Sequence, residues 1–255
     1  SWYMREEAGG LLLGPYEVGA PCCYVDAPSD QSEYELFQED LDRLMPYIET
    51  AIARVPAFGE VGIKKIYNGA IAYTPDGSPI VGPAWDLKNF WLNEGHSFGV
   101  TAAGGAGWQL AEWIVEGEPS IDMMGVDPRR FGPYATRGYL RAKNEETYAN
   151  VFTVHYPDEE RPGGRPLKRA PCYDRMKALG AVFGSVYGWE RPNWFAPEGF
   201  GIEESALDKP DVLLNHNHPP VAADGKVKEV WSFRRSNYFD QVGREARHVH
   251  EQAGL

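Results

Sequence analysis

The chain has 255 residues, of which 43% are hydrophobic, and a formal net charge of -12 at pH 7. This length can bury one large domain or two modest ones, while the negative charge repels phosphate backbones and excludes nucleic acid as an expected partner. No apolar run approaches the roughly 20 residues that span a bilayer, and no segment has the basic start and apolar core of a signal peptide.

The first predicted element is a β-hairpin over residues 1–18, with its turn at residues 8–10. Trp2, Met4 and the leucines at 11–13 supply strand residues on either side of a glycine-containing turn.

A helix is predicted next, over residues 32–55. Ser32 and Glu35 have the spacing of a capping box, in which two side chains satisfy free amides at a helix start. Apolar side chains then recur at helical spacing. Pro46 is expected to kink or restart this helix.

Three extended segments follow. The alternation over residues 64–74 predicts a strand, residues 74–79 predict a tight turn with a short return strand after it, and residues 89–95 predict one more strand.

The stretch "NEGHSFGVTAAGGAGWQLAEWIVEG", residues 93–117, predicts a polar strand end, a glycine-rich turn and an amphipathic helix at about 105–116. Gly117, with Pro119 beyond it, is a normal helix end. Glycine lets a backbone approach a ligand, and a helix N-terminus favours anionic oxygen. Both features suit a flavin, whose N1–C2=O edge becomes negative on reduction.

The alternative is that these glycines only permit tight packing of the helix on a sheet. The turn is not the pyrophosphate-binding turn of a dinucleotide fold, because G-x-G-x-x-G with an acidic residue about 20 positions later is absent.

The remaining chain is more varied. Asp127-Pro128 is expected to start another helical region, and residues 156–171 are loop-like and rich in proline, glycine and charge. Residues 173–197 are aromatic and turn-rich, which predicts packed irregular structure. Residues 201–229 are expected to form a connecting arm, and residues 231–255 a strand-like piece followed by a helix.

Cysteine and histidine spacings do not predict a metal site. The three cysteines include no C-x-x-C pair and favour a reducing compartment. His216 and His218 lie in a polar arm, whereas His248 and His250 lie on a predicted helix, where positions i and i+2 point apart.

Two motifs carry a family resemblance. "TPDGSPIVGP" followed by "GHSFGVTAAGGAGWQLAEWIVEG" resembles the C-terminal part of FAD oxidoreductases related to D-amino-acid oxidase. The segments "DPRRFGPYATRGYLRAKNEETY", "GRPLKRAP", "YGWERPNWF" and "RRSNYFDQVGREARHVHEQAGL" resemble, more narrowly, the dimethylglycine dehydrogenase and sarcosine dehydrogenase family. The resemblance covers essentially the whole chain, and the order of the segments strengthens it.

The resemblance implies an α+β fold in three parts. Residues 1–120 would be the C-terminal, flavin-capping part of an FAD oxidoreductase domain with a mixed sheet. Residues 121–229 would be a central domain and connecting arm, and residues 230–255 the start of a folate-binding domain like the aminomethyltransferase (T-protein) of glycine cleavage. The chain would then be an internal piece of a longer polypeptide, inactive in isolation, whose flavin-linking histidine lies upstream.

The resemblance also implies site residues. The backbone that would face the pyrimidine side of FAD comprises His96, Ser97, Phe98, Gly99, Val100 and Thr101. Tyr3 would face the amine as the catalytic tyrosine. Arg5 and Lys65 are candidates for binding the substrate carboxylate only because each is a cation. An open alternative for His96 is a purely structural hydrogen bond to backbone.

The implied reaction is demethylation of an N-methyl amino acid such as dimethylglycine or sarcosine. A hydride would leave the methyl carbon for FAD, and the resulting iminium would react with tetrahydrofolate or hydrolyse to formaldehyde. An electron-transfer flavoprotein or oxygen would accept the electrons, in a bacterial cytoplasm or a mitochondrial matrix. The alternatives are a non-catalytic regulatory subunit, like that of pyruvate dehydrogenase phosphatase, and a separately encoded subunit that completes a flavin site with a partner.

Overall fold

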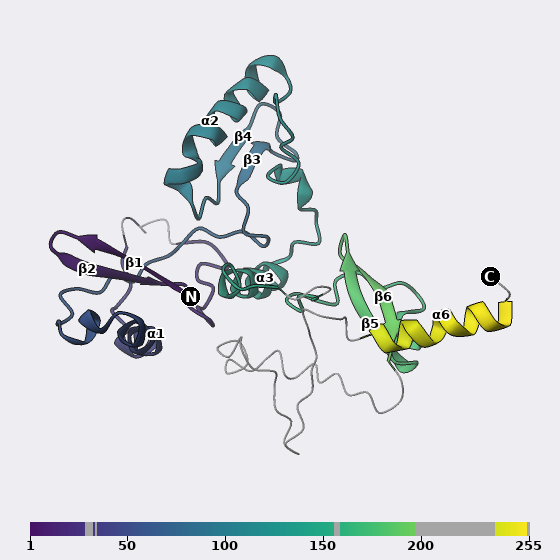
Figure 1. The fold of residues 1–255 in the computed structure, drawn as a ribbon. Coiled ribbons are helices and arrows are strands. Elements are labelled where there is room, and N and C mark those ends of the chain that lie inside the picture. Colours follow the sequence, from purple (N-terminus) through teal and green to yellow (C-terminus); the bar gives the residue numbers. More distant parts are fainter. Residues whose placement is uncertain (29–32, 34, 156–158, 197–237, 254–255) are drawn as a thin grey trace. The chain divides into compact units, whose positions relative to one another are not determined.

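The protein combines helices with small antiparallel sheets, so its fold is α+β (Figure 1). The structure is a computed structural model that describes residues 1–28, 33, 35–155, 159–196 and 238–253. It divides into two compact units, Ser1–Phe152 and Thr153–Leu255. Among the described residues the strands form three separate two-stranded sheets, not the one mixed sheet that was expected.

The first unit contains β1 (Trp2–Glu7), β2 (Gly10–Pro15), α1 (Leu41–Arg54), the 3-10 helix η1 (Pro56–Gly59), β3 (Ile80–Pro83), β4 (Trp91–Glu94), α2 (Gly99–Glu116), the 3-10 helix η2 (Pro128–Arg130) and α3 (Arg137–Ala149). The second unit contains α4 (Tyr173–Ala178), β5 (Ala181–Val186), β6 (Trp189–Phe195) and α6 (Phe239–Ala253).

The predicted N-terminal hairpin is confirmed. Strand β1 pairs antiparallel with β2, so that Tyr3 lies opposite Gly14. The turn consists of Ala8 and Gly9, whose φ angles are 49° and 75°. Two consecutive positive φ angles match the twist of paired strands, and Gly10 therefore belongs to β2 and not to the turn.

Helix α1 is shorter than predicted. It begins at Leu41 because Asp40 is its N-cap, accepting a hydrogen bond at 3.1 Å from an amide in the first turn. Glu35 lies in irregular chain before the helix, and Ser32 lies outside the described residues. The expected capping box therefore does not start α1.

Pro46 does not restart the helix, since α1 continues through it to Arg54. A proline removes one intrahelical hydrogen bond. The Thr50 hydroxyl donates to the Pro46 carbonyl oxygen at 2.8 Å, and the turns on both sides remain helical.

The strand predicted over residues 64–74 is wrong. This stretch has an alternating sequence, but among the described residues no strand pairs with it. Alternation suits a strand only when a neighbouring ladder is present. The return strand β3 pairs instead with β4, with Ile80 opposite Glu94. The predicted turn is confirmed by the hydrogen bond from Gly77 N to Thr74 O, 3.1 Å long.

Helix α2 begins earlier than predicted. It runs from Gly99, so the loop before it covers only residues 95–98. The glycines at 104, 105 and 107 lie inside the helix and not in a turn. The predicted end is confirmed, since Gly117 has a φ of 87° and caps the helix in the left-handed conformation.

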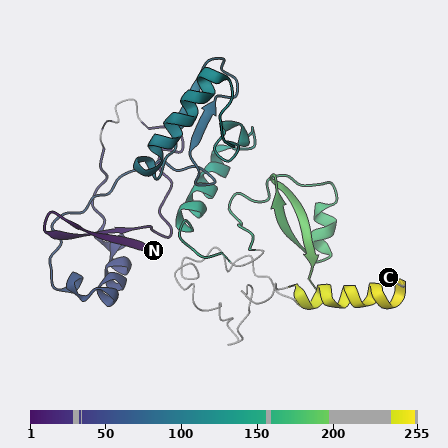
Figure 2. The same cartoon turned by 45° about the horizontal axis from the view of Figure 1, so that its top comes forward.

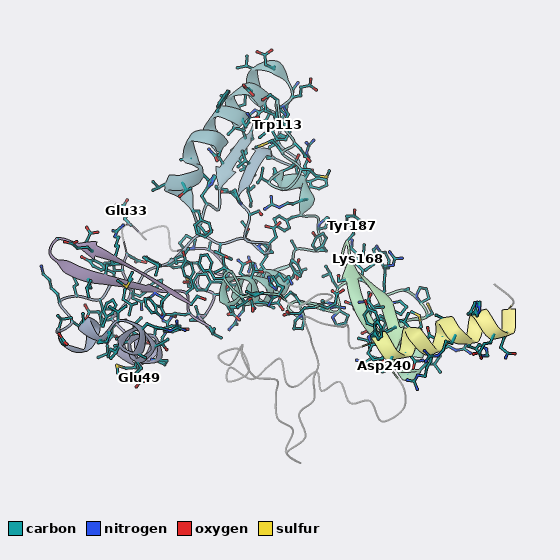
Figure 3. All side chains as sticks on the ribbon, in the orientation of Figure 1. Glu33, Glu49, Trp113, Lys168, Tyr187 and Asp240 are labelled. Carbon is teal, nitrogen blue, oxygen red and sulfur yellow. The ribbon has the colours of Figure 1, made fainter. Side chains whose placement is uncertain are left out.

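The core of the first unit lies between α2 and the β3–β4 pair, which run side by side in Figures 1 and 2. Val81, Trp113 and Met123 are buried there. Trp113 comes from α2 (Figure 3) and meets Trp91 of β4 edge to face, with ring centroids 6.0 Å apart. This packing holds the C-terminal half of α2 against the strands.

The second unit corrects the expectation of irregular structure over residues 173–197. The segment forms α4 and the antiparallel β5–β6 hairpin, whose turn is Tyr187–Gly188. Arg165 donates to both carboxylate oxygens of Glu190, at 3.0 and 2.7 Å, and Glu190 is buried. Aromatic residues alternate with turn residues here because they pack on a short sheet.

The predicted C-terminal helix is confirmed as α6 and carries His248 and His250. The arm over 201–229, the strand-like piece before α6 and the pair His216 and His218 lie outside the described residues. The described ranges contain neither a cluster of three potential metal ligands nor a helix that is long and apolar enough to cross a membrane.

Candidate functional site

The two motifs of the central sequence meet in the first unit. Gly95 has a φ of 70°, and a Cβ atom built there would lie 2.8 Å from Cγ2 of Thr74. Thr74 is itself only 4% exposed. The "TPDGSP" turn therefore supports the chain immediately before His96, and only glycine fits at that contact.

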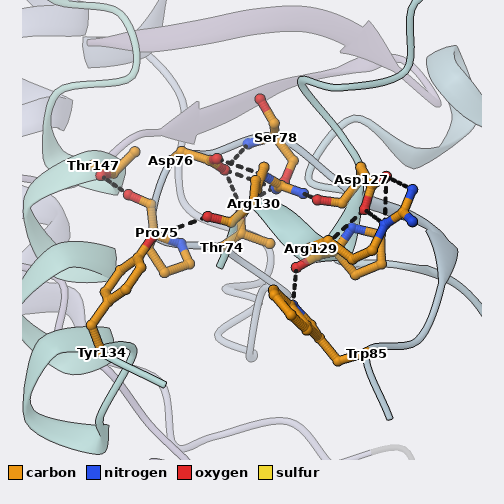
Figure 4. Close-up of polar contacts among 11 residues, drawn as sticks. Thr74, Pro75, Asp76, Ser78, Trp85, Asp127, Arg129, Arg130, Tyr134 and Thr147 are labelled. Carbon is orange, nitrogen blue, oxygen red and sulfur yellow. Dashed lines mark hydrogen bonds and ion pairs between the residues drawn. The ribbon is translucent and has the colours of Figure 1, made fainter. Parts of the chain in front are cut away.

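The turn is held by its own polar groups. The Thr74 hydroxyl lies 2.7 Å from the Ser78 carbonyl oxygen and 3.1 Å from Asp76 Oδ1 (Figure 4). The Ser78 amide donates to the same Asp76 oxygen at 3.0 Å. Asp76 thereby closes the turn through its side chain.

Arg130, at the end of η2, holds this turn from outside. Its Nε donates to Asp76 Oδ2 at 2.7 Å and its Nη2 donates to Asp76 Oδ1 at 3.0 Å (Figure 4). The same guanidinium donates to the carbonyl oxygens of Ser78 and Asp127, at 2.8 and 3.1 Å. The Arg130 side chain is only 13% exposed, whereas the Asp76 side chain is 41% exposed, so the two-pronged ion pair is buried on the arginine side.

Helix α3 adds two further hydrogen bonds to the same segment. The Thr147 hydroxyl donates to the Pro75 carbonyl oxygen at 2.7 Å, and Asn144 Nδ2 donates to the Tyr73 carbonyl oxygen at 2.9 Å. The turn is thus fixed by side chains that follow it by more than 50 residues.

Asp127 organises the start of η2. Burial alone would raise the pKa of its carboxyl group, but hydrogen bonds from the Arg129 side chain and amide outweigh this and lower the pKa. The carboxylate is therefore ionised at neutral pH and caps η2, the element that carries Arg130.

His96 has one satisfied and one unsatisfied ring nitrogen. Its Nε2 lies 2.7 Å from Asn93 Oδ1. Its Nδ1 is buried and has no hydrogen-bond partner among the described residues. If Nε2 donates to the Asn93 oxygen, Nδ1 is left as an acceptor. A buried acceptor of this kind fits a ligand that offers N–H or O–H donors, as a flavin ring and its ribityl chain do.

The N-terminus of α2 has no side-chain cap: Phe98 is the N-cap and makes no capping hydrogen bond. By contrast, Asp40 caps α1 and Thr136 caps α3. A Cβ atom at Gly99 would meet only the Cβ of His96, at an ordinary 3.5 Å. The first amides of α2 are thus available to an anionic oxygen.

Among the described residues, no other element covers the face of α2 that points away from the strands. Val100 is 100% exposed and Trp108 is 66% exposed. A Cβ atom added at Gly104, Gly105 or Gly107 would meet nothing within 4 Å. The glycines therefore do not serve packing on the β3–β4 strands, and they leave a surface that another backbone can approach closely.

A large open cavity of about 1780 Å³ lies elsewhere in the first unit. The hairpin, the extended chain at 61–73 and α3 line it, and Tyr3 and Lys65 are among its lining residues. Arg5 is not among them, and its guanidinium pairs with Glu7 at 2.8 Å. Of the two cations considered for a substrate carboxylate, only Lys65 lines this cavity.

A series of aromatic rings connects the hairpin with the loop before α2. Ring centroids are 6.0 Å apart for Tyr3 and Tyr16, 4.5 Å for Tyr16 and Phe152, and 6.3 Å for Phe152 and Phe98. Tyr148 joins the same cluster, with its centroid 5.9 Å from that of Tyr16. The structure thus connects Tyr3 to Phe98 through packed rings.

Sequence reasoning missed Arg130, Asn144 and Thr147. Asp76 follows a threonine and a proline in an evident turn, but its cation lies 54 residues further along the chain. No local spacing signals such a pair. The hairpin register, in contrast, follows from the two-residue turn and so could have been predicted.

Comparison with known proteins places the chain among flavin-dependent oxidoreductases. A family model for "FAD dependent oxidoreductase" matches residues 1–113, and a model for "FAD dependent oxidoreductase central domain" matches residues 116–170. Together the two matches span most of the first unit and the beginning of the second.

Curated relatives match over most of the chain. Human mitochondrial dimethylglycine dehydrogenase is 35% identical over 100% of the chain and 27% of its own length. Human mitochondrial sarcosine dehydrogenase is 37% identical over 78% of the chain and 22% of its own length. The mouse mitochondrial pyruvate dehydrogenase phosphatase regulatory subunit is 32% identical over 82% of the chain and 24% of its own length. The chain spans about a quarter of the length of these relatives.

Proposed function

Because the chain belongs to the family of FAD dependent oxidoreductases that includes dimethylglycine and sarcosine dehydrogenases, we propose that it is part of a flavoprotein that oxidatively demethylates an N-methyl amino acid. The observation that carries the proposal is that, among the described residues, the start of α2 has no side-chain cap and the Nδ1 of the nearby His96 has no hydrogen-bond partner. Both features offer polar groups to a ligand at the place where the sequence predicts the flavin.

In this proposal the backbone from His96 to Thr101 holds the pyrimidine end of FAD. The amides of Gly99, Val100 and Thr101 would donate to its carbonyl edge, and the positive end of α2 would favour negative charge there. His96 Nδ1 would accept a hydrogen bond from the cofactor. FAD, when bound, supplies the acceptor for the hydride.

The same proposal assigns the substrate to the side of the hairpin. Tyr3 would orient an uncharged amine through its hydroxyl group. A cation would bind the substrate carboxylate, and we favour Lys65 over Arg5, because Lys65 lines the cavity and Arg5 is already paired with Glu7. Tetrahydrofolate would accept the one-carbon unit, and an electron-transfer flavoprotein the electrons.

A second candidate is a non-catalytic regulatory role. It is favoured by the 32% identity to a pyruvate dehydrogenase phosphatase regulatory subunit. Flavin content of the full-length protein, together with oxidation of dimethylglycine or sarcosine, distinguishes the two. A flavin-free full-length protein that oxidises neither amine would favour the regulatory role.

The residue-level test is Gly99→Val in the full-length flavoprotein. The structure has room for a side chain beside His96, so the fold should tolerate the change. A branched side chain beside the first amides of α2 should lower flavin content severalfold by obstructing the ligand's approach. The measurement is flavin absorbance per mole of purified protein.

Gly125→Val is the matched control, since a Cβ at Gly125 also meets nothing within 4 Å and Gly125 lies far along the chain from the loop before α2. It should keep normal flavin content. Equal flavin content in the wild type and Gly99→Val would contradict the assignment of the α2 amides to the cofactor.

A further inference from the structure

We propose that Arg130 is a positioning residue for the flavin: it sets the position of His96 and of the first amides of α2 through the "TPDGSP" turn. The inference rests on the proposed flavin site. It adds a residue from the part matched by the central-domain model, which would act on that site without touching the cofactor.

The first step is the attachment of Arg130 to the turn. Its guanidinium holds both oxygens of Asp76 and the Ser78 carbonyl oxygen. An arginine fork of this kind fixes orientation as well as distance. The Arg130 side chain is 13% exposed and the Asp76 side chain 41% exposed, so the guanidinium is the buried partner of the pair.

The second step passes from Asp76 to Thr74. Asp76 Oδ1 lies 3.1 Å from the Thr74 hydroxyl, which also lies 2.7 Å from the Ser78 carbonyl oxygen. Thr74 is buried, so its rotamer is set by these two polar contacts. The methyl group of Thr74 is thereby fixed in direction.

The third step is steric. The Thr74 methyl group faces Gly95, where an added Cβ would come within 2.8 Å of it. Gly95 immediately precedes His96, and α2 starts at Gly99. A rotation of Thr74 would therefore move the backbone that carries His96. A displacement of about 1 Å is enough to lower the reaction rate substantially in a preorganised site.

The test uses Arg130→Gln in the full-length flavoprotein, with Asp76→Asn as a milder second variant that preserves an oxygen acceptor. We expect both to retain bound flavin but to shift its visible spectrum and to lower kcat for amine oxidation about tenfold or more, with a smaller change in KM. Arg137→Ala is the control, because Arg137 forms an exposed ion pair with Asp26. It should leave both readouts unchanged.

Two substitutions at Thr74 separate positioning from a general loss of stability. Thr74→Val keeps the branched shape against Gly95 but removes the hydroxyl group, so it should reproduce the spectral shift of Arg130→Gln. Combined with Arg130→Gln it should add little further shift, because both changes break the same sequence of contacts. Additive shifts would overturn the inference.

Failure of this inference is distinguishable from failure of the proposed function. If the wild type binds flavin and oxidises the amine, while folded Arg130→Gln and Asp76→Asn do so with unchanged spectrum and kcat, Arg130 has only a structural role. If the wild-type full-length protein binds no flavin, the proposed function itself is wrong.

Discussion

At the scale of single residues, the hydroxyl group of Tyr148 has a pKa far above that of an ordinary tyrosine. Burial, together with the negative charge of Glu17 and the neighbouring tyrosines, raises its pKa to about 12. Its ring also packs edge to face against Tyr73, with centroids 5.3 Å apart. An ionised phenolate is poorly tolerated in this cluster, so Tyr148 links alkaline pH to the stability of the first unit.

The first prediction concerns this linkage. The ordinary tyrosine pKa is 10.0 and the folded value is about 12, so the contribution of neutral Tyr148 is complete below pH 10 and is lost as pH rises toward 12. Tyr148→Phe keeps the ring and removes the ionisation. It should therefore shift the alkaline unfolding midpoint upward, as followed by phenolate absorbance and circular dichroism.

Tyr187→Phe is the matched control, since Tyr187 is 91% exposed in the second unit. It should leave the alkaline midpoint of the first unit unchanged. An unshifted midpoint for Tyr148→Phe would mean that the ionisation of other tyrosines, and not that of Tyr148, controls alkaline unfolding.

At the scale of elements, β3 depends on one glycine. Gly82 has a φ of 142°, and a Cβ there would lie 2.9 Å from Trp113 Cζ3 and 3.1 Å from Pro128 Cδ. Strand β3 and α2 can approach each other only because this position lacks a side chain. The hydrogen bond from Val81 N to Val126 O, 2.9 Å long, is formed at the same approach.

The second prediction is that Gly82→Ala destabilises the first unit by about 2–3 kcal/mol, because it combines backbone strain with overpacking against Trp113. Chemical denaturation followed by tryptophan fluorescence measures the change. Gly10→Ala, on β2, is the control. A Cβ there meets only the Glu7 carbonyl oxygen at an ordinary 3.5 Å, so its effect should be within about 1 kcal/mol.

Sequence patterns predicted those elements whose determinants are local. The hairpin, the turn after Thr74, the end of α2 at Gly117 and the helix near the C-terminus each follow from neighbouring residues. The start of α1 was wrong because two competing caps, Ser32 and Asp40, precede it. The strand at 64–74 was wrong because alternation does not reveal whether a partner strand exists.

Only the part of the candidate site that is contiguous in sequence was predictable. The segment from His96 to Thr101 was found from its glycines and its resemblance to a family. Its support was not, since the Arg130–Asp76 pair joins residues 54 positions apart. The glycines at 104, 105 and 107 were placed in a turn because glycine is a poor helix former, whereas α2 continues through all three.

At the scale of the whole molecule, the two units have separate stabilising centres. The second unit depends on the pair between Arg165 and Glu190, with the Arg165 guanidinium also donating to the Phe183 carbonyl oxygen at 2.9 Å. Burial alone would lower the pKa of Arg165, but Glu190 outweighs this and raises it. The Glu190 side chain is 3% exposed and makes the shortest contact with the arginine, while Glu160 lies 3.7 Å from the same guanidinium.

The third prediction is that Glu190→Ala destabilises the second unit by about 3–5 kcal/mol, because it removes both short contacts of a largely buried cation and leaves only the longer one to Glu160. Hydrogen exchange of the full-length protein should show lost protection over β5 and β6 and unchanged protection over α2. Arg169→Ala, which removes an exposed contact of 3.9 Å with Asp174, should change protection little. Equal losses over α2 would refute separate stabilising centres.

The contact between Arg130 and Asp76 has a practical consequence for protein engineering. The two family matches end and begin at residues 113 and 116, which invites a cut between them for shuffling or separate expression. Such a cut would divide one hydrogen-bonded body, leaving the Asp76 carboxylate without its guanidinium and β3 without the Val126 carbonyl oxygen. Chimaeras between relatives should therefore exchange residues 74–147 as a block.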